Sequence, residues 1–161
     1  MQTVIRNATI NDVPEMHALI AELAKYERAE HEFVLSIDQL KDDGFGAKPI
    51  YQAFVATFDQ QVVGMALVYT KYSTWKGKCI FLEDIIVTES MRGKGIGFSL
   101  FNQCIQYARA QNAGRLEWQV LDWNTPAIEF YKKFEAQLDP TWINGKLTRE
   151  QLKAYPLYES I

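Results

Sequence analysis

One feature limits the possible folds of this chain more than any other. It is a run of β-branched and apolar residues followed closely by a glycine-rich turn. The run is FLEDIIV (81–87), and the turn MRGKGIG (91–97) carries glycine at every second position from its third residue. From Ile96 to Ala108, apolar residues then recur at the spacing of one helix face. The sequence therefore predicts a strand, a bare turn and a helix in close succession.

Such a turn is suited to binding an anion. The first N–H groups of a helix have no partner within the helix, and its dipole favours negative charge at that end. Arg92 and Lys94 add positive charge, and glycine lets a pyrophosphate approach the backbone. A Walker loop does not fit, and a dinucleotide fingerprint would need glycine in place of Phe98. The turn alone leaves open a second interpretation, a solvated basic turn before an ordinary surface helix.

Periodicity predicts the other elements. Strands are expected at 3–6, 51–58, 62–70, 79–87 and 115–121, with short ones at 136–138 and 142–147. Helices are expected at 13–25, from Ser36 to about 43, from 96 to a stop at 112–114, from Asn124, and from about Thr148. This order describes an α/β protein, in the α+β sense of a mixed sheet with helices against it. With 161 residues, 48% of them hydrophobic, we expect a single domain, 1–161.

Charge and composition narrow the function classes. A net charge of -3 gives no reason to expect nucleic acid and makes a cationic small molecule the easier ligand. The chain has no apolar run of membrane-spanning length and no leader pattern, so we expect a cytoplasmic protein without a membrane partner. Cys79 and Cys104 are expected to be buried free thiols, and with His17 and His31 they form no metal pattern, so no metal is expected.

Several separated motifs together resemble the GNAT superfamily of acetyl-CoA-dependent N-acetyltransferases. Within it, the chain looks like the spermidine/spermine N-acetyltransferase branch, and most like its thialysine N-acetyltransferase members. The motifs are ELAKYE (22–27), DGFG (43–46), YSTWKGK (72–78), FLEDIIV (81–87), RGKGIG (92–97), and VLDWN with FYK (120–132). The resemblance implies a GNAT-like acyl-CoA N-acyltransferase fold, with a mostly antiparallel central sheet flanked by helices.

The resemblance also implies where acetyl-CoA, as cosubstrate, would bind. The turn would hold its pyrophosphate, the strand before the turn would pair with its pantetheine arm, and the start of a later helix would contact it from the opposite side. The residues implied are Ile85, Ile86, Val87, Arg92, Gly93, Lys94, Gly95, Ile96, Gly97, Phe98, Asn124, Thr125, Pro126 and Ala127.

Two residues match the family's catalytic positions. An alkylamine has a pKa near 10, so roughly one molecule in a few thousand is unprotonated at pH 7, and a base must remove a proton. Glu83 matches that base, acting directly or through water, and Tyr131 matches the acid that protonates the departing thiolate. The alternatives are an outward-facing strand carboxylate and a tyrosine packed in the core. Strand alternation puts Asp84 on the face opposite Glu83, so a bulge or a splayed strand would be needed for both to reach one site.

Substrate contacts are implied in the same way. Carboxylates and aromatic faces suit an ammonium group, although solvated acids and ordinary aromatics are the alternative at each position. The matching residues are Tyr26, Glu27, Trp75, Glu83, Asp84, Glu117, Trp118 and Gln119.

Two positions depart from the branch. Ser73-Thr74 replaces an acidic residue of spermidine-type members, which favours a shorter amine such as thialysine or a lysine-like compound. Glu135 stands where the family usually has glycine, and a left-handed backbone there would cost roughly 1 kcal/mol.

The leading hypothesis is therefore a homodimeric N-acetyltransferase that acetylates a primary amine of a small cation: thialysine, a lysine-like compound, a diamine or a polyamine. Transfer would occur by direct attack in a ternary complex. The alternatives are a protein or peptide N-acetyltransferase, and a non-catalytic acyl-CoA-binding or sensing module.

Overall fold

A five-stranded mixed sheet forms the centre of the first of two compact units in this protein. The computed structural model describes residues 3–156, and their contacts divide the chain between Gln119 and Val120. The strand order is β1-β2-β3-β4-β5; β1 to β4 are antiparallel neighbours, and β5 runs parallel to β4. The strands are β1 (Val4–Asn7), β2 (Gln52–Phe58), β3 (Gln61–Ser73), β4 (Gly77–Val87) and β5 (Leu116–Trp118). The predicted α/β class with a mostly antiparallel sheet is confirmed.

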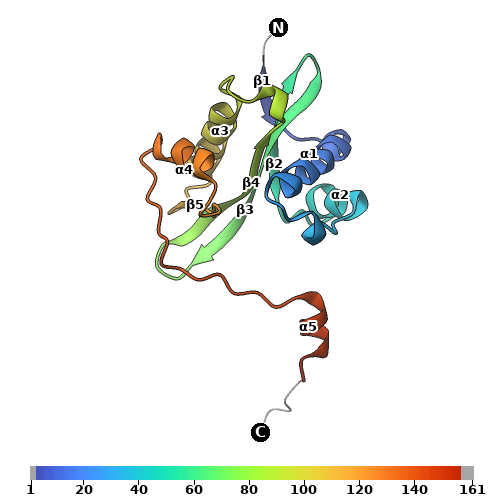
Figure 1. Ribbon diagram of the computed structural model, residues 1–161, viewed down its shortest axis with the longest axis vertical. Coiled ribbons are helices and arrows are strands. Elements are labelled where there is room, and N and C mark those ends of the chain that lie inside the picture. The colour runs from blue at the N-terminus through green and yellow to red at the C-terminus, as the bar shows by residue number, and fades with distance from the viewer. Residues whose placement is uncertain (1–2, 157–161) are drawn as a thin grey trace. The chain divides into compact units, whose positions relative to one another are not determined.

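Helices cover both faces of this sheet. Figure 1 shows α1 (Val13–Tyr26) and α2 (Ile37–Phe45) on one face and α3 (Ile96–Ala110) on the other. The helices begin where the sequence predicts: Pro14 stands in the first turn of α1, and the Ser36 hydroxyl accepts a hydrogen bond from the Gln39 N–H at the start of α2. Three short 3-10 turns complete the unit: η1 (Ile10–Asp12), η2 (Glu30–Glu32) and η3 (Glu89–Met91).

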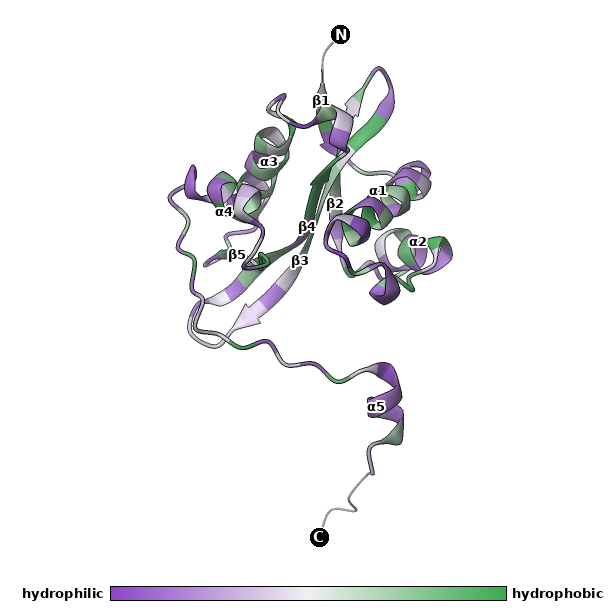
Figure 2. Ribbon diagram, in the orientation of Figure 1, coloured by the Kyte–Doolittle hydropathy of each residue, from purple (hydrophilic) through white to green (hydrophobic). Residues whose placement is uncertain are grey.

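The core lies on both sides of the sheet. On the α1 face, alternate residues of β2 and β3 pack against one stripe of α1 in a cluster that includes Val13, Met16, Leu19, Leu40, Ala53, Val55, Met65, Leu67 and Ile86. On the α3 face, Phe54 packs edge-on against Tyr107, with ring centroids 5.6 Å apart. Figure 2 shows the apolar residues of the central strands between these helices. Cys79 and Cys104 are buried free thiols, as predicted.

The hairpin between β2 and β3 is tighter than the predicted three-residue link. Phe58 pairs with Gln61, so the loop contains Asp59 and Gln60 alone. Both loop residues have positive φ, 48° and 68°, which is the pattern of a type I′ turn. The sequence did not indicate this turn because neither loop residue is glycine.

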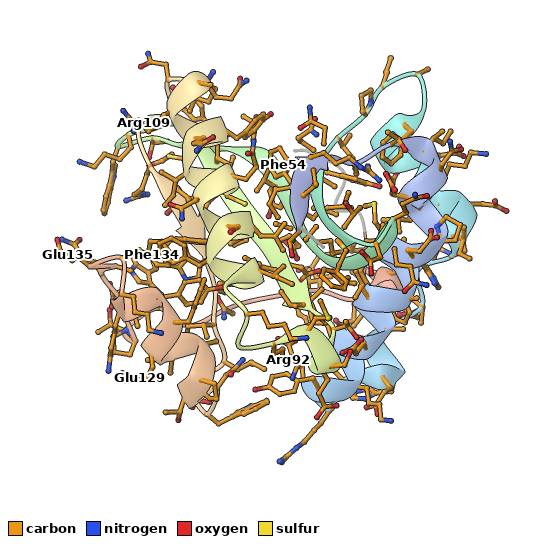
Figure 3. The ribbon with its side chains drawn as sticks, turned by 90° about the horizontal axis from the view of Figure 1, so that it is seen from above. Phe54, Arg92, Arg109, Glu129, Phe134 and Glu135 are labelled. Carbon is orange, nitrogen blue, oxygen red and sulfur yellow. The ribbon has the colours of Figure 1, made fainter. Side chains whose placement is uncertain are left out.

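The second unit contains α4 (Thr125–Lys132) and α5 (Arg149–Ala154). The strands predicted at 136–138 and 142–147 are wrong, because those residues form no ladder with any strand. The Asp139 carboxylate instead accepts hydrogen bonds from the N–H and hydroxyl of Thr141 and bends the chain. Glu135, labelled in Figure 3 after α4, has φ 55°, so its backbone is left-handed even though the residue is not glycine.

Candidate active site

A β-bulge in β4 places two neighbouring carboxylates on one face of the sheet. Leu67 of β3 pairs with Asp84, but the next residue, Val68, pairs with Leu82, which leaves Glu83 as the extra residue. A bulge of this kind re-aims side chains that would otherwise alternate across the sheet. The expectation that Glu83 and Asp84 need a bulge in order to share a site is therefore matched by the structure.

The contacts of these two residues show which face they share. Glu83 is itself exposed, yet it reaches Tyr69: the tyrosine's pKa is raised by burial first, then by the charge of Glu83 and a hydrogen bond to it. Tyr69 packs against the core cluster beneath α1. Asp84 lies on the same face, because its partner Leu67 belongs to that cluster.

A third carboxylate, Glu27 at the end of α1, completes an acidic cluster of Glu27, Glu83 and Asp84. Burial first, and then the charges of Glu83 and Glu27, together raise the pKa of Asp84 to about 7. Burial also raises the pKa of Glu27. Because the charges of Glu83 and Glu27 oppose the ionisation of Asp84, a cation bound beside the three carboxylates would relieve that repulsion.

Next to the acidic cluster, β4 has a neighbour on only one side. The parallel ladder between β4 and β5 ends at Leu82 and Trp118, whereas β3 continues to pair with β4 as far as Val87. In the part of the chain described, the stretch 83–87 therefore presents one edge of backbone groups without a second strand. Such an edge can accept an extended ligand as though it were another strand. Ile85, Ile86 and Val87, the residues predicted to meet pantetheine, lie in this stretch.

The glycine turn follows the same stretch. Gly93 and Gly95 have φ values of 75° and 80°, and a Cβ built on either would meet no atom within 4 Å. Glycine is therefore required here by the left-handed backbone, and the space beside the turn is open. Gly95 caps α3, so the first N–H groups of that helix begin at Ile96. Ile96 is buried and anchors the helix, whereas Phe98 is half-exposed.

Arg92 is held beside the turn by its neighbours. Its Nε donates to the Val87 carbonyl at 2.9 Å, and its guanidinium carbon lies 5.2 Å from the centroid of the Tyr26 ring. Figure 3 shows Arg92 at the turn before α3. Tyr26, predicted as an amine contact, thus lies against a residue predicted to bind the cofactor.

The remaining predicted substrate residues of the first unit lie along β5 and at a hairpin tip. Glu117 is paired with Arg115 at 2.9 Å and with Lys71 at 3.4 Å, so its charge is already compensated. Trp118 packs edge-on against Phe101, with centroids 5.2 Å apart, and Gln119 follows it as an exposed residue.

Trp75 does not join the acidic cluster within one chain. It is 79% exposed in the turn between β3 and β4. That turn lies roughly 20 Å from Glu83, at about 3.3 Å per strand residue. Its part in the site stays a prediction.

The second unit carries the other predicted residues. The Asn124 side chain accepts a hydrogen bond from the Ala127 N–H at 3.3 Å and so caps α4, with Thr125 and Pro126 in its first turn. Tyr131 is buried, and its ring packs edge-on against Phe130 at 5.2 Å. A tyrosine that merely packs in the core would be buried in the same way. The catalytic role of Tyr131 therefore stays a prediction.

Sequence reasoning did not identify Glu22 as part of this region. Its carboxylate accepts hydrogen bonds from the Thr88 hydroxyl and the Glu89 N–H, immediately before the glycine turn. A signal was present, because Glu22 and Tyr26 lie four residues apart and therefore on one face of a helix.

Residues 3–156 contain neither a membrane-spanning helix nor a cluster of metal ligands. No helix there is long and apolar enough to cross a membrane. No group of three or more histidine, cysteine, aspartate or glutamate side chains there is arranged to hold a metal ion.

Comparison with known proteins identifies the family of this chain. Residues 14–135 match the model of the acetyltransferase (GNAT) family. The chain is 39% identical over 142 residues to a thialysine N-epsilon-acetyltransferase of Bos taurus, covering 83% of this chain and 84% of that protein. It is 31% identical over 158 residues to the human spermidine/spermine N(1)-acetyltransferase-like protein 1, covering 92% of this chain and 23% of that protein.

The fold also has solved counterparts. An integron cassette protein from the mobile metagenome of V. cholerae superposes with a TM-score of 0.77 at 23% identity, covering 95% of this chain and 96% of that one. At this identity the likeness concerns the fold alone, whereas the family match and the bovine relative concern the sequence. The chain therefore belongs to the acetyltransferase (GNAT) family.

Proposed function

We propose that this protein acetylates a primary amine of a small cationic molecule, with acetyl-CoA as the donor, in a ternary complex. Family membership already makes it an acetyltransferase, and acetyltransferases of this family use acetyl-CoA. The observation that carries the proposal is the bulge at Glu83. It places the acidic cluster next to the unpaired edge of β4 and to a glycine turn whose N–H groups and cations can bind an anion. An acidic cluster attracts the amine, and the edge and turn suit a coenzyme.

The donor would lie along β4 and the glycine turn. The free edge of 85–87 would pair with pantetheine, while the turn 92–98 and the N–H groups of α3 would hold the pyrophosphate. The resemblance to the family also implies coenzyme contacts for Asn124, Thr125, Pro126 and Ala127, the residues that cap and begin α4. This positioning brings the thioester to the amine and makes the attack effectively unimolecular.

Proton transfer would start at the acidic cluster. In the proposed reaction, Glu83 removes a proton from the ammonium group, directly or through water, and the freed lone pair attacks the thioester carbonyl. The tetrahedral intermediate then collapses by breaking its C–S bond, and the Tyr131 hydroxyl protonates the thiolate that leaves. The nitrogen, still cationic after the attack, gives its surplus proton to the resulting tyrosinate, which leaves a neutral amide and restores Tyr131. Asp84, with a pKa of about 7, is ionised by an approaching ammonium group and becomes its counter-charge.

The amine class follows from the charges and the relatives. Glu27, Glu83 and Asp84 supply negative charge near the thioester end, and Tyr26 supplies an aromatic face. The relatives named for thialysine and for spermidine/spermine support a primary amine that carries a second cationic or polar group. Glu117 contributes less charge than the sequence suggested, because Arg115 and Lys71 already pair with it.

A thiol-release assay tests the proposal and separates it from its alternatives. Acetyl-CoA is supplied with thialysine, lysine, ornithine, diamines, polyamines or a basic peptide, and free coenzyme A is measured over time. Turnover with one or more of the small amines supports the proposal. Turnover with the peptide alone favours a protein or peptide acetyltransferase, and binding of acetyl-CoA without turnover favours a sensing module.

Replacing Tyr131 with phenylalanine tests the proposed acid. Tyr131→Phe removes one hydroxyl from a buried ring, so we expect kcat to fall by about 10²- to 10⁴-fold with coenzyme affinity nearly unchanged. Tyr107→Phe is a matched control, because Tyr107 lies in α3 against Phe54 and has no proposed part in the chemistry. Equal kcat in Tyr131→Phe and wild type would remove Tyr131 from the mechanism.

Assembly and location are proposals of the same kind. The resemblance to the branch supports a homodimer, and sedimentation would show it as a particle of twice the 18.6 kDa chain mass. A cytoplasmic location is proposed because both acetyl-CoA and small amines are available there.

A further inference from the structure

One carboxylate of α1, that of Glu22, joins this helix to the start of the proposed coenzyme turn by two hydrogen bonds and an ion pair. The Glu22 Oε2 accepts from the Thr88 hydroxyl at 3.0 Å, and its Oε1 accepts from the Glu89 N–H at 2.9 Å. The same Oε1 lies 3.5 Å from Nη2 of Arg92. These three residues and Glu22 are separated by more than 60 positions in the sequence.

The contact with Glu89 satisfies a helix terminus. Glu89 is the first residue of η3, and Thr88, which stands at its N-cap, makes no capping hydrogen bond with its side chain. The first N–H groups of any helical turn need an external acceptor. Glu22 supplies that acceptor from another element, and the Thr88 hydroxyl is turned toward Glu22 instead of toward η3.

The three contacts differ in strength, and the shorter two dominate. The ion pair with Arg92 is long, and both side chains are more than a third exposed, so solvent screens it. The bonds to Thr88 and Glu89 have ordinary hydrogen-bond lengths and use a charged acceptor, which strengthens them. The main effect of Glu22 is therefore to fix the backbone that leads into the turn.

This backbone determines where the turn's cations and N–H groups point. Arg92 follows η3 directly, and its N–H donates to the Glu89 carbonyl at 3.2 Å. Gly93 and Gly95 come next with left-handed backbones, which have no side chain to hold them in place. A disordered η3 would therefore leave Arg92 and the start of α3 without a fixed position.

We propose that Glu22 is a positioning residue that orders η3 and Arg92 before the coenzyme arrives, so that less ordering is needed on binding. The inference rests on the proposed function, because it takes the ligand of the turn to be acetyl-CoA. Glu22 acts through Thr88 and Glu89 and does not touch the reacting atoms.

A rival effect has the opposite sign. The Glu22 carboxylate is an anion near a site for an anionic coenzyme, so its removal would relieve repulsion and tighten binding. Glu22→Gln separates the two effects, because the amide oxygen still accepts from Glu89 and the amide can still bond Thr88, while the charge is gone. Glu22→Ala removes both the charge and the hydrogen bonds.

The experiment compares these variants in two measurements. In calorimetric titration, we expect Glu22→Ala to weaken acetyl-CoA binding by about tenfold, and Glu22→Gln to stay within about twofold of wild type. With saturating acetyl-CoA, kcat of both variants should change by less than about threefold, because the chemistry is untouched. In ligand-free protein, amides of 89–97 should exchange hydrogen about tenfold faster in Glu22→Ala than in Glu22→Gln.

Matched controls guard against a general loss of structure. Glu15→Ala makes the same truncation two turns earlier on α1, at the wall of the same hollow of about 360 Å³ that Glu22 and Thr88 line, and should leave both measurements unchanged. Thr88→Val keeps the shape of the side chain but removes one of the two short bonds, and should give an intermediate loss. It also keeps the test decisive if Glu22→Ala fails to fold.

Two results would overturn the inference. In the first, Glu22→Ala and Thr88→Val bind acetyl-CoA and exchange hydrogen like wild type. In the second, both Glu22 variants bind acetyl-CoA more tightly, which would mean that the main effect of Glu22 is to repel the anionic coenzyme. A wild-type protein that bound no acetyl-CoA would instead remove the proposed function. The exchange comparison would then still decide whether Glu22 orders the turn.

Discussion

At the scale of single residues, Asp84 shows how the site differs from an ordinary surface. Its pKa of about 7 lies far above the ordinary 3.8 because the side chain is largely removed from water and faces Glu83 and Glu27. Between these two pKa values the unfolded chain loses the proton while the folded chain keeps it. The free energy of unfolding therefore falls as pH rises from about 4 to 7, and the contribution from protonated Asp84 is fully present only below about pH 4.

Replacing Asp84 with asparagine tests this sign. Asparagine does not ionise, so Asp84→Asn should be more stable than wild type above pH 7, and its gain should be several times smaller at pH 4.5. The upper limit of the gain is about 4 kcal/mol, from a shift of about 3 units (7 minus 3.8) at about 1.4 kcal/mol per unit, and partial exposure reduces it. Urea unfolding at both pH values measures it. Asp42→Asn, at an exposed position of α2, is the control, and a gain independent of pH would contradict the assignment.

Residue identities were predictable here, but their surroundings were not. The sequence pointed to Glu83 and Asp84 through the FLEDIIV motif, and to Gly93 and Gly95 through their spacing. It could not locate the bulge, because a bulge depends on how β3 pairs with β4 and leaves no mark in the strand itself. The raised pKa of Asp84 follows from that pairing, so the sequence alone could not predict it.

At the scale of elements, the connection from β1 to α1 depends on one buried carboxylate. Arg6 of β1 donates two parallel hydrogen bonds of 2.7 Å to Asp12, and the Thr9 N–H and hydroxyl also donate to Asp12 Oδ2. These bonds, the one from Arg6 first, lower the pKa of Asp12 to about 2. The stabilisation is therefore present above about pH 4 and is lost as pH falls toward 2.

Replacing Asp12 tests how much this carboxylate stabilises the connection from β1 to α1. We expect Asp12→Ala to lower the free energy of unfolding by about 2–4 kcal/mol at pH 7, because it leaves the Arg6 and Thr9 donors without their acceptor. The difference from wild type should shrink below pH 4, where Asp12 takes up a proton. Arg6→Lys keeps the charge but not the paired geometry and should lose less. An Asp12→Ala midpoint in urea equal to that of wild type would contradict this role.

Element prediction succeeded where local signals were sufficient. Capping residues and periodicity predicted the helices that begin at Val13, Ile37 and Thr125, and periodicity predicted the strands of the β2–β3 hairpin. The failures, at 136–138 and 142–147, lie where apolar residues alternate but no neighbouring strand pairs with them. A strand exists only with a partner, and the sequence of one segment does not say whether the fold provides one.

At the scale of the whole molecule, the negative charge of the protein favours amine substrates that carry positive charge. The chain has 20 acidic and 17 basic residues, and three of its acids gather at the bulge. An acidic protein with a local acidic cluster attracts cations over a distance set by the Debye length, about 30 Å at 0.01 M salt and well under 10 Å at 0.5 M. The attraction grows with the charge of the ligand, so salt should weaken a dication's binding more than a monocation's.

Salt dependence of the amine KM therefore tests the proposed substrate class and the acidic cluster together. Acetyl-CoA is kept saturating, so that the coenzyme stays bound even when salt screens Arg92 and Lys94. Under this condition we expect the KM of a diamine to rise about tenfold between 0.01 and 0.5 M NaCl, and the KM of a monoamine to rise about threefold. Glu27→Gln should reduce the slope for the diamine because it removes one charge of the cluster, whereas Glu15→Gln, twelve residues earlier on α1, should reduce it much less. Equal slopes for the two amines, with no effect of Glu27→Gln, would mean that the amine is recognised by shape and hydrogen bonding and that the acids at the bulge serve proton transfer alone.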